Sequence, residues 1–229
     1  MREQIDTLVG PVIDTPVDIV ITVKSLGRAK TRLLGAADRG IGDRAAHEAL
    51  ALALVRDTVA AATATPGVRS VLVVTSDPTV ADALATDGVA TTPDLPDAGL
   101  NAAFAHGAEL LLLADPRATV AALQSDLPAL RPGHLAAALA EAAGRRAFCA
   151  DRQGTGTTLL VAAPGGPLDP RFGPGSAAAH AASGAVRIGA DLPALRCDVD
   201  TAADLALARR MGVGVHTCSV VDLSCVHPA

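Results

Sequence analysis

Apolar residues occur along this chain in short runs separated by longer segments with helical spacing. Three runs rich in Val, Ile, Ala and Leu lie at 18–23, 70–75 and 119–123. Runs of this length and composition predict strands that are buried on both faces of a parallel sheet. Between and after them, apolar residues recur at helical spacing over 43–64, 78–87, 100–113 and 132–143. Strands that alternate with helices of this length predict an α/β fold, with a mixed, mostly parallel sheet covered by helices on both faces.

The pattern changes after the fourth predicted helix. Two apolar runs at 147–150 and 157–162 predict strands joined by a turn over 151–154. A short Ala-rich helix is predicted from Ser176, and a last helix over 201–211. The chain therefore has no strict βα alternation in its second half.

The two ends of the chain lack periodicity. We therefore predict one Rossmann-like nucleotidyltransferase domain over 17–212, with a flexible tail at 1–16 and a loosely packed tail at 213–229. The first tail has no apolar leader, and no apolar stretch is long enough to span a bilayer. We expect a cytoplasmic protein that does not contact a membrane.

The charge distribution argues against binding to nucleic acid. The 229 residues carry a formal net charge of −5, and no block of consecutive basic residues occurs. Binding to a phosphate backbone requires clustered Lys and Arg, and base stacking usually requires Trp or Tyr, of which the chain has none. We therefore expect no nucleic-acid partner. The residues leave the oligomeric state open, with a homodimer as one option.

The loop after the first predicted strand is rich in cations. Of the 19 basic residues only Lys24 and Lys30 are lysines, and both lie in this loop together with Arg28 and Arg32. Open parallel sheets bind ligands beyond the carboxyl ends of their strands. Lys and Arg at that place suit a triphosphate, and a solvated surface loop is the alternative. The loop has neither the P-loop motif nor the dinucleotide-binding glycine pattern, which removes the common ATPase and dehydrogenase interpretations.

Three aspartates are candidate ligands of Mg²⁺. Asp126 follows the third predicted strand, while Asp198 and Asp200 stand at alternate positions and point the same way if their segment is extended. Carboxylates of this kind hold Mg²⁺, which bridges substrate phosphates and neutralises their charge. Each could instead serve a helix N-terminus, and either Asp200 or Thr201 suits the cap of the last helix.

Glycine-rich segments at 154–158 and 171–176 form a further candidate site. Ser176 begins a predicted helix, where N–H groups and a hydroxyl can bind an anion. An ordinary capped helix after a flexible loop is an equally good interpretation. Ser176 and His180 share a helical face, but the chain has no G-x-S-x-G motif, so we expect no hydrolase triad. The histidines show no metal-ligand spacing, and we expect all of them to be structural or exposed.

Together these segments resemble the CofC/FbiD family, the guanylyltransferases of coenzyme F-420 biosynthesis. The resemblance covers about 19–212 and rests on V-K-S-L-G-R-A-K-T-R-L, G-L-N, Q-S-D-L-P-A-L, A-D-R-Q-G-T-G-T, D-P-R-F-G-P-G-S and R-C-D-V-D-T. The shared order of several motifs makes the match specific. The chain departs from some relatives in its tails and at Gly175, where an acidic residue can occur, and this leaves the acceptor preference open.

The resemblance implies that a phosphate oxygen of the acceptor attacks the α-phosphate of GTP and releases pyrophosphate. The acceptor would be phosphoenolpyruvate or 2-phospho-L-lactate, and Mg²⁺ would be the cofactor. The implied metal ligands are Asp126, Asp198 and Asp200, and the implied catalytic residues are Asp126, Asp198 and Lys30. The implied nucleotide-binding residues are Lys24, Lys30, Arg32 and Asn101, and the implied acceptor-binding residues are Thr157, Gly173 and Ser176.

Other functions of the same residues remain open at this point. The nearest is a nucleotidyltransferase of the same fold with a molybdopterin or sugar-phosphate acceptor. A glycosyltransferase could use Asp198-Val199-Asp200 as its metal motif. A nucleotide sensor without catalysis is a third alternative, although binding alone seldom requires three carboxylates.

Overall fold

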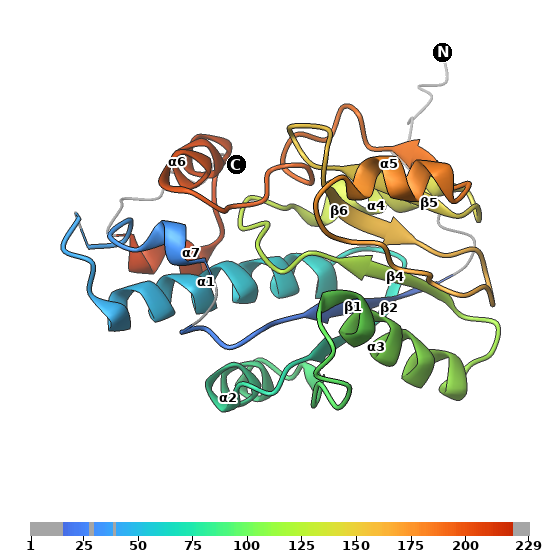
Figure 1. Cartoon of the computed structure of the whole chain (residues 1–229), viewed down its shortest axis with the longest axis horizontal. Coiled ribbons are helices and arrows are strands. Elements are labelled where there is room, and N and C mark those ends of the chain that lie inside the picture. Colours follow the sequence, from blue (N-terminus) through green and yellow to red (C-terminus); the bar gives the residue numbers. More distant parts are fainter. Residues whose placement is uncertain (1–15, 28–29, 39, 222–229) are drawn as a thin grey trace, which may run out of the picture.

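A parallel sheet with one reversed strand forms the centre of the computed structural model, which describes residues 16–27, 30–38 and 40–221 (Figure 1). The strand order in the described residues is β3-β2-β1-β4-β6-β5-β7, and β6 alone runs antiparallel to its neighbours. The strands are β1 (Val17–Thr22), β2 (Val68–Val74), β3 (Ala90–Thr92), β4 (Thr119–Leu123), β5 (Ala147–Ala150), β6 (Thr157–Val161) and β7 (Val186–Ile188). The predicted mixed, mostly parallel sheet is confirmed.

Helices cover both faces of the sheet, because alternate residues of each central strand point to opposite sides. Ile19 and Ile21 of β1 pack with apolar residues of α1, α2 and α4, whereas Val20 packs with residues of α3 and α5. The helices are α1 (Arg44–Thr63), α2 (Pro78–Thr86), α3 (Leu100–Ala114), α4 (Pro132–Ala142), α5 (Ser176–Ala182), α6 (Ala202–Met211) and α7 (Val215–Val220), with a 3-10 turn, η1 (Thr31–Leu33). The predicted helices on both faces are therefore also confirmed.

The end of the domain lies beyond the predicted boundary at 212. Helix α7 packs on α1 (Figure 1), and Asp57 of α1 accepts hydrogen bonds from the backbone N–H groups of His216 and Thr217 at 3.0 and 2.8 Å. The predicted tail over 213–229 is thus wrong for residues 213 to 221. Six helical residues carry too little periodicity to be recognised, and their cap lies almost 160 positions away. Residues 222–229, and residues 1–15 of the predicted tail at 1–16, lie outside the described residues.

The close approach of α3 to the sheet depends on Gly107. A Cβ at this position would lie 2.6 Å from Val20 and 2.8 Å from Val74, in the neighbouring strands β1 and β2. Distances this short require the helix to move away from the sheet. This approach sets the position of the whole of α3, including its first turn near the carboxyl ends of the strands.

We predict that Gly107→Ala lowers the free energy of unfolding by about 1–3 kcal/mol, because overpacking outweighs the gain in helix propensity. The matched control is Gly133→Ala in α4, where an added Cβ meets no atom within 4 Å. Urea unfolding followed by circular dichroism measures both. Equal stability of the two variants would show that α3 does not depend on this close contact.

Candidate active site

A cleft lies at the carboxyl ends of β1 and β4, which are neighbours in the sheet. The cavity there has a volume of about 390 Å³. Cationic side chains from the loop after β1 line it together with carboxylates from later segments of the chain. Its lining residues are Thr22, Lys24, Lys30, Thr31, Arg32, Leu100, Gln124, Ser125, Asp126 and Asp200. Three predicted nucleotide-binding residues and two predicted metal ligands therefore share one cavity.

The backbone brings the segment of Asp198 and Asp200 alongside Asp126. The N–H group of Val199 donates to the carbonyl oxygen of Asp126 at 3.0 Å, and the Val199 side chain is fully buried among α1 and α6 residues. Because side chains alternate in an extended segment, Asp198 and Asp200 point away from that buried side. The prediction that these aspartates share an orientation is consistent with this placement.

The cap of α6 leaves Asp200 available for the cleft. Thr201 accepts the N–H of Asp204, and the Asp204 carboxylate accepts the N–H of Thr201, which together form a capping box. Of the two alternatives for this cap, Thr201 is the one that the structure shows.

Lys30 lies between Asp126 and Asp200. Its ammonium group contacts one carboxylate oxygen of each aspartate, although Asp126 and Asp200 lie 96 and 170 positions after Lys30 in the sequence. Lys30 has a left-handed backbone with φ of 55° at the start of η1, which turns its side chain into the cleft. Two carboxylates that contact the same ammonium nitrogen are close enough to contact the same metal ion.

The carboxylates repel one another in this site. Burial, followed by the charges of Asp126 and Asp200, raises the pKa of Asp198 to about 7. Burial would lower the pKa of Lys30, but attraction to Asp126 and Asp200 overcomes it and raises that pKa above its ordinary value. The second oxygen of Asp126 is buried and has no hydrogen-bond partner among the described residues. A cation at this place would satisfy that oxygen and offset the repulsion.

In this structure the carboxylates of Asp126 and Asp200 are paired with Lys30. Among the described residues, no group of three or more His, Cys, Asp or Glu side chains is arranged as a metal site. The ammonium of Lys30 contacts both Asp126 and Asp200. The donor set itself, which consists of carboxylate oxygens, fits Mg²⁺.

The predicted acceptor residues lie at the start of β6, in the loop before α5 and at the first residue of α5. The N–H of Gln124 donates to the carbonyl of Thr158 at 2.9 Å, so Thr157 lies beside the residues that lead from β4 to Asp126. Ser176 donates to the hydroxyl of Thr157 at 3.1 Å. Gly173 has a φ of 132°, and an added Cβ would meet no protein atom within 4 Å, so its backbone is open to a ligand.

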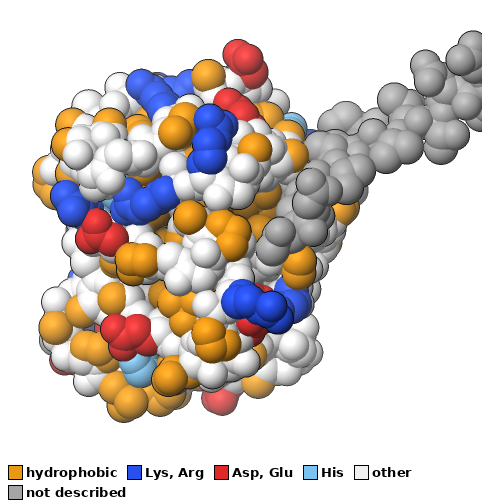
Figure 2. Space-filling view, turned by 90° about the vertical axis from the view of Figure 1, so that its right-hand side faces the viewer, with side chains coloured by type: hydrophobic (Ala, Val, Ile, Leu, Met, Phe, Trp, Pro, Cys, Tyr) orange, Lys and Arg blue, Asp and Glu red, His pale blue; other side chains and the backbone are white. Residues whose placement is uncertain are grey.

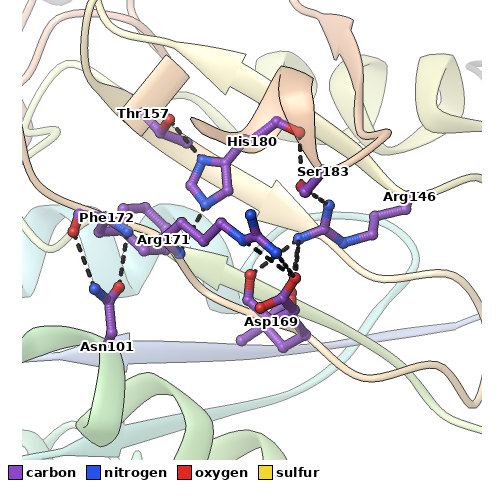
Figure 3. Close-up of polar contacts among 9 residues, drawn as sticks. Asn101, Arg146, Thr157, Asp169, Arg171, Phe172, His180 and Ser183 are labelled. Carbon is purple, nitrogen blue, oxygen red and sulfur yellow. Dashed lines mark hydrogen bonds and ion pairs between the residues drawn. The ribbon is translucent and has the colours of Figure 1, made fainter. Parts of the chain in front are cut away.

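Asn101 does not line the cleft. Its side-chain oxygen accepts the N–H of Phe172 at 2.7 Å, and its side-chain nitrogen donates to the Phe172 carbonyl at 3.0 Å (Figure 3). Both polar atoms of the amide are thus engaged by backbone. The side chain of Asn101 thus secures the loop before α5, and its contact with the nucleotide stays a prediction.

His180 is the residue near the site that sequence reasoning missed. It is fully buried and contacts Thr157 and the backbone of Arg171 (Figure 3). Its spacing of four from Ser176 placed both on one helical face, which was the available signal.

Charged side chains are dispersed over one face of the molecule. Figure 2 shows one face on which Lys and Arg side chains occur in separate groups, with acidic side chains near them. A continuous basic patch is absent from that face, as far as its described residues show. No helix in the described part of the chain is long and apolar enough to cross a membrane.

Known proteins resemble this chain along most of its length. No protein-family model matches it. A protein from Salinispora arenicola, described as phosphoenolpyruvate guanylyltransferase, is 53% identical over 202 residues, which are 87% of this chain and 90% of that protein. The chain belongs to the phosphoenolpyruvate guanylyltransferase family. Members from Thermomonospora curvata and Mycobacterium marinum are 50% and 43% identical, and the alignments cover 88% and 90% of this chain and 87% and 93% of theirs.

Solved structures show the same fold. A structure described as a nucleotide-diphospho-sugar transferase from Desulfovibrio desulfuricans superposes with a TM-score of 0.61 at 16% identity, over 86% of this chain and 87% of that chain. A nucleotidyl transferase from Methanothermobacter gives a TM-score of 0.57 at 20% identity, over 86% and 97%. The predicted nucleotidyltransferase fold is confirmed, and the sequence resemblance to the guanylyltransferases is confirmed by the phosphoenolpyruvate guanylyltransferase family.

We predict that Lys30→Met lowers the free energy of unfolding by about 1–3 kcal/mol in the presence of a chelator, because it leaves two neighbouring carboxylates without a counter-ion. Lys24→Met is the matched control, since Lys24 is an exposed lysine of the same loop and forms no ion pair with any described residue. Urea unfolding at low salt measures both. Equal stabilities of the two variants would contradict the bridging role of Lys30.

Proposed function

We propose that this chain transfers GMP from GTP to the phosphate of phosphoenolpyruvate, or of the closely similar 2-phospho-L-lactate, and releases pyrophosphate. An oxygen of the acceptor phosphate forms a bond to the α-phosphorus of GTP, and the bond between that phosphorus and the bridging oxygen to the β-phosphate breaks. The names of relatives that share 43–53% of their residues with the chain support this reaction. It would place the chain in coenzyme F-420 biosynthesis.

One observation carries the proposal: Asp126 and Asp200 both contact the ammonium group of Lys30 at the edge of the sheet. The cavity that they line also contains Lys24 and Arg32. The cations would bind the triphosphate, with Arg32 donating in pairs and the lysines acting as point charges. Mg²⁺ held by Asp126, Asp198 and Asp200 would neutralise charge on the reacting phosphates.

Lys30 would exchange partners when the substrate binds. In the structure its ammonium neutralises the two aspartates. A divalent ion at the aspartates would release it toward the phosphates of GTP. The acceptor would lie near Thr157, Gly173 and Ser176. The pairing of β6 with β4 brings Thr157 beside the Asp126 segment, and Ser176 hydrogen-bonds to Thr157. The acceptor phosphate is already an anion, so catalysis requires alignment and charge neutralisation and no covalent nucleophile.

We predict that Asp126→Asn reduces Mg²⁺-dependent product formation at least about 100-fold while the fold is retained, because a metal ligand and a negative charge are lost. The assay incubates the protein with GTP, Mg²⁺ and phosphoenolpyruvate and identifies the products by mass. Asp82→Asn on the exposed side of α2 is the control and should keep wild-type activity.

The same assay separates the alternatives. Pyrophosphate release with a sugar phosphate or molybdopterin and not with phosphoenolpyruvate would assign a different acceptor. Release of a nucleoside diphosphate would indicate a glycosyltransferase, and tight GTP binding without any turnover would indicate a sensor. Full activity of Asp126→Asn would remove this aspartate from the mechanism.

A further inference from the structure

A buried histidine connects the two segments proposed to hold the acceptor (Figure 3). His180 of α5 has no exposed surface. One ring nitrogen, Nδ1, lies 2.9 Å from the hydroxyl of Thr157, and the other, Nε2, lies 3.0 Å from the backbone nitrogen of Arg171. The ring packs against Phe172 at 5.2 Å and near Phe148 at 6.0 Å between centroids. Burial of an imidazole costs free energy unless its ring nitrogens form hydrogen bonds.

The backbone of Arg171 determines which ring nitrogen carries the proton. A backbone N–H can only donate, so Nε2 must accept and carries no hydrogen. The neutral ring therefore has its hydrogen on Nδ1 and donates it to Thr157. Burial lowers the pKa of His180 to about 4, with smaller contributions from Arg146 and Arg171 and an opposing one from Asp169. The ring is thus neutral at physiological pH.

This arrangement leaves one hydroxyl hydrogen without a partner among the residues that the structure describes. Thr157 accepts from Nδ1 of His180 and also from the hydroxyl of Ser176 at 3.1 Å. A hydroxyl has two acceptor positions and one hydrogen, so the hydrogen of Thr157 remains to be donated elsewhere. If the Thr157–Ser176 bond is reversed, the free hydrogen is on Ser176. In both cases the pair keeps one hydroxyl hydrogen that it can donate, and in the reversed case Thr157 also keeps one free acceptor position.

We propose that His180 is a positioning residue: it holds Thr157 as an accepting partner so that the Thr157–Ser176 pair donates a hydrogen bond to the anionic acceptor. The inference rests on the proposed function, because it takes the phosphorylated acid as the ligand beside Thr157. The location supports it, since the start of β6 lies beside the end of β4, next to Asp126. A donor is the group that an anion requires there.

The loop before α5 is also secured independently of His180. Arg146 donates to the carbonyls of Leu168 and Asp169, and Asn101 binds both polar backbone groups of Phe172 (Figure 3). Replacement of His180 should therefore change the polarity at Thr157 more than the course of the loop. This difference makes Asn101→Ala a suitable control, because it loosens the loop without a contact to Thr157.

The test measures KM for phosphoenolpyruvate, KM for GTP and kcat in single and double variants. His180→Phe keeps a ring in the apolar pocket but removes the donor to Thr157. We expect its KM for phosphoenolpyruvate to rise about 10- to 100-fold, the effect of a lost hydrogen bond to a charged group, with KM for GTP nearly unchanged. His180→Asn, whose amide nitrogen can replace Nδ1, should restore most of the affinity.

A double variant separates positioning from simple support of the loop. Thr157→Val should raise the same KM, and His180→Phe added to Thr157→Val should have little further effect, because the residue through which it acts is gone. Asn101→Ala should add its own effect to Thr157→Val in full. Direct titration of phosphoenolpyruvate by calorimetry gives the same comparison without turnover.

The outcomes distinguish the two proposals. If the wild-type protein neither binds nor uses phosphoenolpyruvate, the proposed acceptor is wrong and the role of His180 falls with it. If the wild-type protein is active and His180→Phe keeps its KM, or if the two substitutions simply add, the positioning role alone is overturned. Should His180→Phe fail to fold, the comparison of His180→Asn with Asn101→Ala decides. Wild-type affinity of His180→Asn for phosphoenolpyruvate, with weaker binding when Thr157→Val is added to it, supports the role. Equal losses of affinity in His180→Asn and Asn101→Ala contradict it.

Discussion

The candidate active site depends on one electrostatic constraint, the repulsion among three carboxylates that lie close together at the edge of a hydrophobic sheet. The hydrogen bond from Val199 to the carbonyl of Asp126 fixes the two parts of the chain side by side, and Asp200 lines the cleft together with Asp126. Burial and, after it, the charges of Asp126 and Asp200 raise the pKa of Asp198. Lys30 offsets this repulsion in the structure. A site that requires a cation for its own stability is already prepared for a metal ion and for the phosphates that accompany it.

The rest of the fold serves this arrangement. Parallel pairing of β1 with β4 places the cationic loop next to Asp126, and the reversed strand β6 brings Thr157 to the same edge. Because β6 runs opposite to its neighbours, its first residues lie at the carboxyl ends of those neighbouring strands. The sheet thus delivers nucleotide-binding and acceptor-binding groups to one edge from segments more than 100 positions apart. The rigid helices behind them, α1 and α3, hold this edge in place.

Sequence reasoning was most successful where the signal is local. The positions of β4, α3 and α6 follow from periodicity and capping residues, and Asp126 was found because it stands just after an apolar run. It failed where the signal is a long-range contact. The role of Asn101 in securing the loop before α5 depends on a backbone 71 positions away, and α7 depends on a cap from α1. Strands β3 and β7 have three residues each, which is too short for any periodicity, and they form because the sheet edge offers unpaired backbone groups.

The most direct measurement is a crystal structure of the protein with GTP and Mn²⁺ in place of Mg²⁺, in which anomalous scattering locates the ion. The account predicts an ion at about 2.0–2.3 Å from carboxylate oxygens of Asp126 and of at least one aspartate of the 198–200 segment, with Lys30 displaced to a phosphate. An ion held by phosphates alone, with Lys30 still between Asp126 and Asp200, would contradict it.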